Sequence, residues 1–306
     1  YQPEEAESKE AEAAKVKAKV CMNVFAHLGK TADKEHIMTE SRHLFYKKDF
    51  FDKLDQDPYL MGFNNGVMDF REKVFRPGKP DDFVSMSTKI NYVKLDKNNQ
   101  KQQEIVDEVT EFLHQLFPIQ EEYEYMFDHL ASTLIGNSVN QTFTMYNGEG
   151  RNGKSVLVSL MGKILGDYKV DVPLGLICGN RVAEGGTSAE KAALKGARYA
   201  VFQEPRKGDK INEGKMKELT SGKDAISCRA PYMPNMITFV PQATFAIACN
   251  VMMEVDSNDG GTWRRIRVAD FLSYFTENPV DNDPTKPYQF PVDCEIDNKF
   301  DRWKEV

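Results

Sequence analysis

The sequence has few residues of the kinds that build disulfide or metal frameworks. It contains five cysteines and five histidines in 306 residues, and no two cysteines share a CxxC spacing. An odd number of widely separated cysteines argues against a disulfide scaffold or zinc ribbon and for a reducing, intracellular environment. The histidines are scattered without ligand spacing, so we expect no metal cluster built from them.

Long hydrophobic runs are also absent. No stretch of about 18 apolar residues occurs, so we expect no transmembrane helix and no membrane partner. The first residues are charged and lack the apolar core of a secretory signal. The chain starts at Tyr1 rather than at methionine and finishes in a helix-like stretch, residues 300–306, so we expect it to be a piece of a longer protein.

An excess of positive charge is missing too. Against 40 lysines and arginines stand 47 aspartates and glutamates, which gives a formal net charge of −7. Proteins that cover duplex DNA electrostatically are basic, so any contact of this chain with nucleic acid has to be local, in a channel or on a loop. The length fits one to three domains with a large hydrophobic core.

The pattern along the chain predicts two domains with a boundary near residue 98. Residues 1–30 have helical periodicity, and short strands with a tight turn at Asn64-Asn65-Gly66 are expected up to residue 92. After a polar stretch, two amphipathic helices are predicted over 105–117 and 123–135. We therefore expect a smaller α+β or helical domain, 1–98, and a larger domain, 99–306.

The larger domain has the alternation typical of an α/β fold. Residues 142–147, 199–202 and 245–249 are apolar and rich in strand-forming residues, and residues 156–165 carry apolar side chains at helical spacing. Strands that alternate with helices predict a parallel sheet flanked by helices.

A glycine-rich loop stands between the first of these strands and the helix. It fits the pattern GxxxxGK[ST] without exception, as Gly148-Glu149-Gly150-Arg151-Asn152-Gly153-Lys154-Ser155. Glycines let successive backbone N–H groups point at phosphate oxygens, and the helix N-terminus adds partial positive charge. Lys154 supplies charge to the β- and γ-phosphates, and the Ser155 hydroxyl can ligate Mg²⁺. The loop predicts a P-loop NTPase that binds ATP and Mg²⁺.

Two other strands end in polar residues that suit the same chemistry. Glu204 follows the strand 199–203, where a carboxylate can hold Mg²⁺ or polarise the attacking water; Gln203 stands where many such enzymes have a second acid. Asn250 closes the strand 245–249, and its amide can orient the water beside the γ-phosphate. The alternative for Asn250 is a residue that only starts a turn.

Adjacent arginines, Arg264 and Arg265, have two interpretations. One is a solvated strand edge. The other is an arginine finger, whose planar guanidinium stabilises charge on a γ-phosphate bound in a neighbouring subunit. Spacing alone leaves both open.

A hairpin is expected between Glu204 and Asn250. Two extended stretches flank a tip rich in proline and asparagine, with the cations Lys223 and Arg229 and the apolar residues Tyr232 and Met233. These four side chains suit contact with a nucleic-acid backbone and its bases. An ordinary hairpin at the edge of the sheet is the alternative.

These five elements, in this order, resemble the superfamily-three helicases, a branch of the AAA+ ATPases. More narrowly, the chain is similar to the helicase part of the primase-helicase of poxviruses and nucleocytoplasmic giant DNA viruses. The similarity lies in Asn147-Gly148 to Ser155, Gln203-Glu204-Pro205, Lys210 to Gly214, Thr262 to Ile266 and Pro287 to Phe290. Residues 54–69 are similar to the domain that precedes the helicase in that family.

The resemblance implies an ATP-dependent DNA helicase of viral genome replication. It implies a homo-hexameric ring with ATP between subunits, where one subunit supplies Lys154, Ser155, Glu204 and Asn250 and the next an arginine, with Arg265 preferred. Single-stranded DNA would move three-prime to five-prime against the hairpins, and residues 1–98 would form a collar. A primase domain upstream, other replication proteins as partners and a virus replication site in the host cell follow from the same likeness.

Two other functions are compatible with the loop. An AAA+ protein-remodelling ATPase would thread polypeptide through a ring, and the hairpin argues against it. A ring-forming DNA scaffold with a vestigial nucleotide site is opposed by the intact Lys154, Ser155 and Asn250. The chain departs from the pattern of the family that it resembles at two places. Gln203 stands where a second acid is common, and Lys223 stands where members of that family often have glycine.

Overall fold

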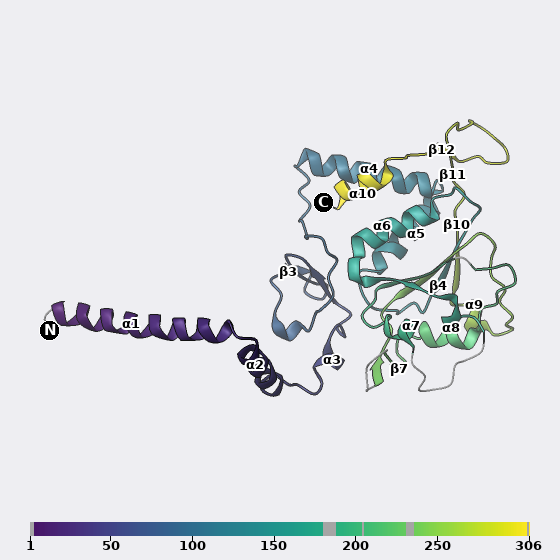
Figure 1. Cartoon of the computed structure of the whole chain (residues 1–306). Helices are drawn as coiled ribbons and strands as arrows, with labels where there is room; N and C mark the ends of the chain where they lie inside the picture. Colours follow the sequence, from purple (N-terminus) through teal and green to yellow (C-terminus); the bar gives the residue numbers. More distant parts are fainter. Residues whose placement is uncertain (1–2, 180–187, 204, 231–235, 305) are drawn as a thin grey trace. The chain divides into compact units, whose positions relative to one another are not determined.

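The computed structural model describes residues 3–179, 188–203, 205–230, 236–304 and 306 (Figure 1). Contacts divide the chain into two compact units, residues 1–51 and 52–306. The domain boundary expected near residue 98 lies inside the second unit and stays a prediction. In the described part of the chain, no helix combines the length and the apolar character needed to cross a membrane.

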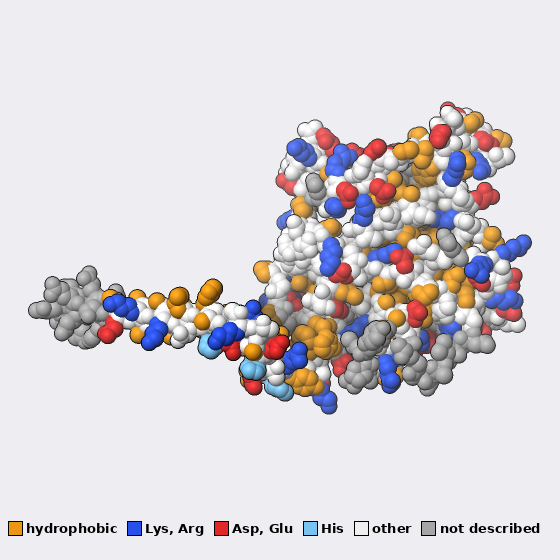
Figure 2. Space-filling view, viewed as in Figure 1, with side chains coloured by type: hydrophobic (Ala, Val, Ile, Leu, Met, Phe, Trp, Pro, Cys, Tyr) orange, Lys and Arg blue, Asp and Glu red, His pale blue; other side chains and the backbone are white. Residues whose placement is uncertain are grey.

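The first unit contains two helices, α1 (Pro3–Leu28) and α2 (Thr31–Leu44). The helix expected over residues 1–30 is therefore confirmed. Figure 2 shows hydrophobic side chains among charged ones along this unit. In the part of α1 whose side chains are described, the large exposed hydrophobic residues are Val16, Val20, Met22, Val24, Phe25 and Leu28.

The second unit begins with a small antiparallel sheet, after the short helix α3 (Phe50–Lys53) that spans the boundary. Its strands are β1 (Leu60–Phe63), β2 (Gly66–Asp69) and β3 (Val74–Arg76), followed by the turn η1 (Pro80–Asp82). Strand β1 pairs with β2 so that Phe63 lies opposite Gly66, which makes Asn64-Asn65 a two-residue hairpin loop. The predicted tight turn is confirmed.

The larger part of this unit is an α/β assembly. Its first half contains α4 (Gln100–Leu116), α5 (Gln120–Ser132), β4 (Phe143–Asn147), α6 (Lys154–Leu165), η2 (Gly166–Tyr168), β5 (Lys169–Val172), η3 (Leu174–Leu176), α7 (Ala189–Ala192) and β6 (Tyr199–Gln203). Its second half contains α8 (Glu213–Leu219), β7 (Ile226–Arg229), β8 (Met236–Phe239), β9 (Thr244–Cys249), α9 (Gly260–Trp263), β10 (Ile266–Asp270), β11 (Tyr274–Thr276), β12 (Gln289–Pro291) and α10 (Ile296–Trp303).

Five parallel strands form the central sheet, in the order β10-β4-β9-β6-β5. The predicted α/β fold with a parallel sheet is confirmed. Because the strands are parallel, all their carboxyl ends meet at one edge, where binding sites of such sheets lie. The glycine loop follows β4 there, and Asn250 follows β9.

Alternating side chains bury both faces of this sheet. Tyr146, Val201 and Ala246 lie in one hydrophobic cluster, which includes residues of α4, α5, α6 and α10. Phe143, Phe202 and other intervening residues lie in a second cluster with α8 and the β7–β8 hairpin. The period of two along each strand thus produces three layers, with the helices α4 to α6 on one side in Figure 1.

A buried arginine joins the small antiparallel sheet to the central one. Arg198, directly before β6, donates from Nη1 to the carbonyl of Pro58 (2.5 Å) and from Nη2 to those of Leu60 (2.9 Å) and Asp57 (3.1 Å). Its side chain is 2% exposed, and burial lowers its pKa to about 10, so it stays charged at neutral pH. The hydrogen bonds of Arg198 therefore connect the small sheet with the start of β6 in the central sheet.

We expect Arg198→Met to lower the free energy of unfolding by roughly 3 kcal/mol, because three buried hydrogen bonds from a charged donor are lost. The carbonyls of Pro58 and Asp57 keep a second donor, the N–H groups of Gly136 (2.8 Å) and Leu60 (3.4 Å), whereas the Leu60 carbonyl loses its Arg198 partner. Urea unfolding of the purified chain measures this loss. The matched control is Arg206→Met, an exposed arginine of the same unit, which should change stability by at most about 0.5 kcal/mol. Equal stabilities of the two variants would contradict the role of Arg198.

A buried histidine makes stability depend on pH. His129 of α5 has its Nε2 atom 2.8 Å from the Tyr146 hydroxyl, which also accepts a hydrogen bond from Tyr199 (3.0 Å). Burial lowers the pKa of His129 from 6.5 to about 4. Between pH 6.5 and pH 4, His129 is protonated in the unfolded chain but neutral in the folded chain. The folded state is therefore destabilised as pH falls through this range.

The expected loss is about 3 kcal/mol between pH 6.5 and pH 4 from this side chain alone. His129→Gln, which stays neutral, should make the unfolding free energy measured across that range less steep. His36→Gln, at an exposed histidine of α2, should keep the slope of the unmodified chain. An unchanged slope in His129→Gln would show that the acid sensitivity arises elsewhere.

Candidate nucleotide-binding site

Steric constraints explain the glycines of the loop between β4 and α6. Gly153 has φ +82°, and a Cβ there would press into Leu116 of α4. A Cβ at Gly148 would lie against the Asn152 side chain and 2.9 Å from the carbonyl oxygen of Phe271. The Gly148 N–H donates to the carbonyl of Cys249, the last residue of β9 (3.3 Å). The loop is therefore packed closely onto two strand ends and α4.

Lys154, the first residue of α6, points into this loop. Its Nζ donates to the carbonyls of Gly148 (2.5 Å) and Glu149 (3.0 Å) and to Oδ1 of Asn152 (2.9 Å). Asn152 is itself buried and donates to the carbonyl of Phe271 (3.3 Å). Burial lowers the pKa of Lys154. A cation is thus held at the centre of a loop that lies at a helix N-terminus, which is an arrangement suited to phosphate.

Of the two predicted metal ligands, Ser155 and Glu204, the structure describes only Ser155. Ser155 is exposed in the first turn of α6, beside the glycine loop, and its role as a metal ligand stays a prediction. Glu204 lies outside the described residues. Gln203, in the place of a second acid, donates from Nε2 to Oδ1 of Asp171 on β5 (2.8 Å).

Two other strand ends bring polar groups to this edge. Asn250 is exposed and directly follows Cys249, whose carbonyl binds the first residue of the loop. Asp270, at the end of β10, accepts from Nδ2 of Asn147 (2.7 Å). Asp270 was not predicted; the signal available was an acid that closes the strand 266–270, as Glu204 closes its own strand.

The arginine pair lies at the opposite end of the sheet. Arg265 directly precedes β10, and its carbonyl accepts from the N–H of Phe143, the first residue of β4 (2.8 Å). The glycine loop follows the last residue of the same strand. Five residues of strand separate the two ends by about 16 Å. The guanidinium groups of Arg264 and Arg265 are therefore not brought together with Lys154 of their own chain.

The predicted hairpin between β6 and β9 is confirmed as the antiparallel pair β7–β8, with Arg229 opposite Met236. Lys223 and Arg229 are exposed. Tyr232 and Met233 lie outside the described residues. Arg229 is the last residue of β7, whereas Lys223 lies three residues before this strand, at the start of the segment that leads into the hairpin. Contact of the two side chains with DNA stays a prediction.

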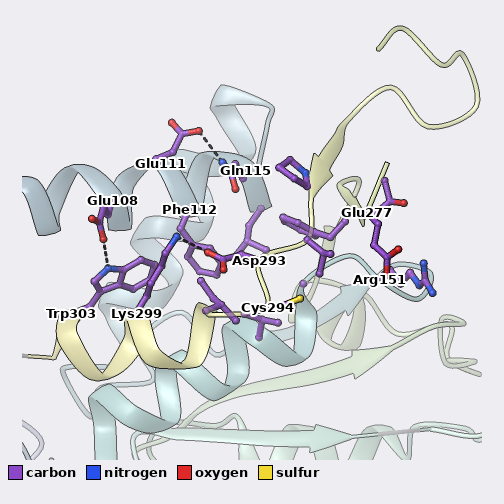
Figure 3. A pocket seen from close by; sticks show the side chains of 18 of the residues that line it. Glu108, Glu111, Phe112, Gln115, Arg151, Glu277, Asp293, Cys294, Lys299 and Trp303 are labelled. Carbon is purple, nitrogen blue, oxygen red and sulfur yellow. Dashed lines mark hydrogen bonds and ion pairs between the residues drawn. The ribbon is translucent and has the colours of Figure 1, made fainter. Parts of the chain in front are cut away.

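A pocket of about 720 Å³ opens beside the glycine loop (Figure 3). Arg151, Gly153 and Val156 form the wall on the loop side, and the N–H of Phe275 on β11 donates to the carbonyl of Arg151 (2.8 Å). The other walls come from α4, from β11 and the residues after β12, and from α10. Figure 3 shows Arg151 and Glu277 at the end of the pocket away from Trp303.

Apolar side chains line this pocket, and several of its charged groups are paired. Glu108 accepts from the Trp303 indole (2.9 Å), and Lys299 lies 2.5 Å from Asp293. Sequence reasoning missed the pocket because its walls come from three segments that lie about 35 to 200 positions apart in the chain, which no local pattern links. Its size and apolar character suit a small organic ligand.

Comparison with known proteins gives matches along the whole chain. Residues 2–118 match the family described as "D5 N terminal like", and residues 146–265 match a "Family of unknown function (DUF5906)". The second match spans the glycine loop, the hairpin and the arginine pair.

Viral proteins are among the similar sequences. A "Putative helicase" of Acanthamoeba polyphaga mimivirus is 33% identical over 98% of this chain and 32% of its own length. A "Putative helicase" of Frog virus 3 is 26% identical over 89% of this chain and 34% of its length. A "Putative primase" of African swine fever virus is 26% identical over 84% of this chain and 26% of its length. The chain therefore spans about a third or less of these relatives.

Similar solved structures include the NrS-1 C terminal region, with 14% identity, a TM-score of 0.45 and coverage of 71% of this chain and 45% of that one. The JCV helicase has 15% identity, a TM-score of 0.36 and coverage of 56% and 46%. These scores are too low to add to the fold described above.

The sequence matches confirm the resemblance, and the chain is a homologue of the proteins named "Putative helicase" and "Putative primase" in large DNA viruses, with a D5 N terminal like segment.

Proposed function

We propose that this chain is the ATP-hydrolysing helicase part of a viral genome-replication protein, working as a homo-hexameric ring on single-stranded DNA. The observation that carries the proposal is the Lys154 ammonium inside a glycine loop at the carboxyl edge of a parallel sheet. The names of the viral relatives support the helicase activity.

ATP is the proposed substrate because the glycine loop, which suits phosphate, lies next to a pocket of suitable size for a nucleoside. In this arrangement the triphosphate lies along residues 148–155, and Lys154 exchanges its contacts with the loop carbonyls for phosphate oxygens. The pocket lined by Arg151, Gly153 and Val156 receives the nucleoside. Its volume of about 720 Å³ falls within the range of small-ligand pockets.

Hydrolysis in this proposal is an in-line attack of water on the γ-phosphate. Asn250, one residue beyond the strand that binds Gly148, orients the water, and Glu204 is the proposed carboxylate that polarises it. Lys154 and the N-terminal N–H groups of α6 offset the charge that develops on the phosphates. Ser155 and Glu204 would hold Mg²⁺, which would supply further positive charge beside the phosphates.

A ring is proposed because one chain holds its arginines too far from its own loop. The strand length of about 16 Å between them exceeds the reach of an arginine side chain, so an arginine finger serves a neighbouring subunit's ATP. Arg264 is exposed and Arg265 half-buried; Arg265 stays the preferred finger, as in the family pattern.

Contact with DNA is assigned to the β7–β8 hairpin. Lys223, just before β7, and Arg229, the last residue of β7, are exposed and can bind the phosphate backbone, with Tyr232 and Met233 proposed to contact bases. In a ring, six such hairpins face a common channel and carry the strand three-prime to five-prime. A net-acidic chain with locally basic hairpins suits a protein that binds DNA only in a channel.

Lys154→Ala should abolish ATP turnover and weaken ATP binding at least about tenfold, because the phosphates lose their central cation. Turnover is measured by phosphate release, and binding by the rise in melting temperature with added ATP. Lys97→Ala, at an exposed lysine outside the loop, should keep both properties. Turnover retained in Lys154→Ala would overturn the assignment of the loop.

Single-stranded DNA should stimulate ATP turnover several-fold, whereas an unfolded polypeptide should not. The double variant Lys223→Ala with Arg229→Ala should lose the stimulation, and its salt slope of DNA binding should be smaller by about 1.4 for each subunit whose hairpin contacts the strand, since two phosphate contacts per subunit disappear. Turnover with and without each polymer, and DNA binding at several salt concentrations, are the measurements. Stimulation by polypeptide alone would favour the protein-remodelling ATPase instead.

A further inference from the structure

One glutamine joins the arginine pair to the hairpin segment. Gln141 lies between α5 and β4 with φ +54°, in the left-handed region. Its Oε1 accepts from Nη2 of Arg264 (2.6 Å) and from Nη2 of Arg265 (3.2 Å). Its Nε2 donates to the carbonyl of Ser221 (2.6 Å), between α8 and β7. A single amide therefore bonds both arginines on one side and the start of the hairpin on the other.

The arginine end of this bridge depends on the amide. Arg265 is also held by the carbonyl of Gly261, which accepts from Nη1 (2.6 Å), while its Nε is buried without a partner among the described residues. Burial lowers the pKa of Arg265, and the neighbouring charge of Arg264 lowers it further. Two like charges thus share one neutral acceptor, and without it their repulsion would drive the guanidinium groups apart.

The other end of the bridge sets the beginning of the hairpin. Ser221 is buried, and its hydroxyl accepts from the N–H of Asp224 (2.9 Å). Gly222 has φ +67°, and a Cβ there would lie 2.6 Å from the carbonyl oxygen of Ser138, three residues before Gln141. The segment that leads to Lys223 is therefore seated against the loop that carries Gln141.

A second connection runs in parallel through α8 and α9. Lys217 of α8 lies 2.5 Å from Asp259, the N-cap of α9. Glu213 of α8 accepts from the hydroxyl of Thr262 in α9 (2.7 Å). Helix α9 contains Gly261, the second acceptor of Arg265. Two sets of contacts thus connect α8 and the start of the hairpin with the arginines, and the one through Gln141 is the more direct.

We propose that Gln141 is a positioning residue that orients the arginine pair toward a neighbouring subunit's nucleotide and couples this orientation to the DNA-binding hairpin. The proposal rests on the proposed ring ATPase. Gln141 touches no substrate in this arrangement and acts only through Arg264, Arg265 and Ser221. DNA held at the hairpin and ATP held between subunits then influence each other through one side chain.

The test begins with Gln141→Met, which has a similar length but offers neither hydrogen bond. We expect kcat for ATP to fall by roughly 10- to 100-fold, as for a misplaced catalytic group. KM for ATP should change by less than about threefold, because the nucleotide-binding loop of each variant subunit is intact. Gln120→Met, at an exposed glutamine of α5, should keep the activity of the unmodified chain.

Mixed rings separate positioning from a merely structural role. In a mixture of Gln141→Met and Lys154→Ala subunits, some interfaces combine an intact loop from the first with intact arginines from the second, so turnover should exceed the sum of the separate variants. A mixture of Gln141→Met with Arg265→Ala contains no such interface and should show no gain. Gln141→Asn, one methylene shorter, replaces Gln141→Met if the latter does not fold.

The outcomes are distinguishable. Unmodified turnover in Gln141→Met, or no gain with Lys154→Ala, overturns the role of Gln141. Turnover retained in Lys154→Ala, or in the double variant Arg264→Ala with Arg265→Ala, would instead refute the proposed ATPase ring itself. A low kcat with a large rise in KM would place Gln141 in its own subunit's nucleotide site and would also contradict the inference.

Discussion

The parallel pairing of β4 with β9 on one side and β10 on the other is the constraint on which the rest of the structure depends. It aligns Asn147 with Cys249 and with Asp270, so three strands end at one level. The glycine loop can then bind the end of β9 through Gly148, and Lys154 is enclosed by the loop. The same pairing fixes Arg265 at the far end of β4.

Sequence patterns predicted those elements whose conformation depends on residues close together in the chain. The loop needed glycines because Gly148 and Gly153 have no room for a Cβ, and a helix had to follow Lys154 to present its N–H groups. The Asn64-Asn65 turn and the β7–β8 hairpin were predicted for the same reason, since alternating strands and turn residues lie side by side in the sequence. Most of the candidate site could therefore be named from the sequence.

What the sequence could not supply depends on partners far apart in the chain. The order of strands, with β9 between β4 and β6, follows from packing and not from any one segment. The pocket beside the loop combines α4 with α10, and Gln141 bonds residues about 80 and 120 positions away. A glutamine before a strand carries no pattern that distinguishes it from a surface residue. Its meaning appears only when Arg264, Arg265 and Ser221 surround it.

The geometry of the sheet also explains why a connection such as Gln141 is useful. Each chain has the glycine loop at the carboxyl edge and the arginine pair at the amino edge of the sheet, so in the proposed ring every ATP site is assembled from two subunits. An arginine that serves another subunit's site does not contact the nucleotide bound by its own chain, so that nucleotide cannot orient it directly. Its orientation has to come from elements packed around it, and the described contacts of Arg264 and Arg265 lead to Gln141 and α9, both bonded to α8 or the segment that follows it. If DNA binds the hairpin as proposed and displaces it, the arginines are the groups of the neighbouring ATP site that this displacement reaches through the fewest contacts.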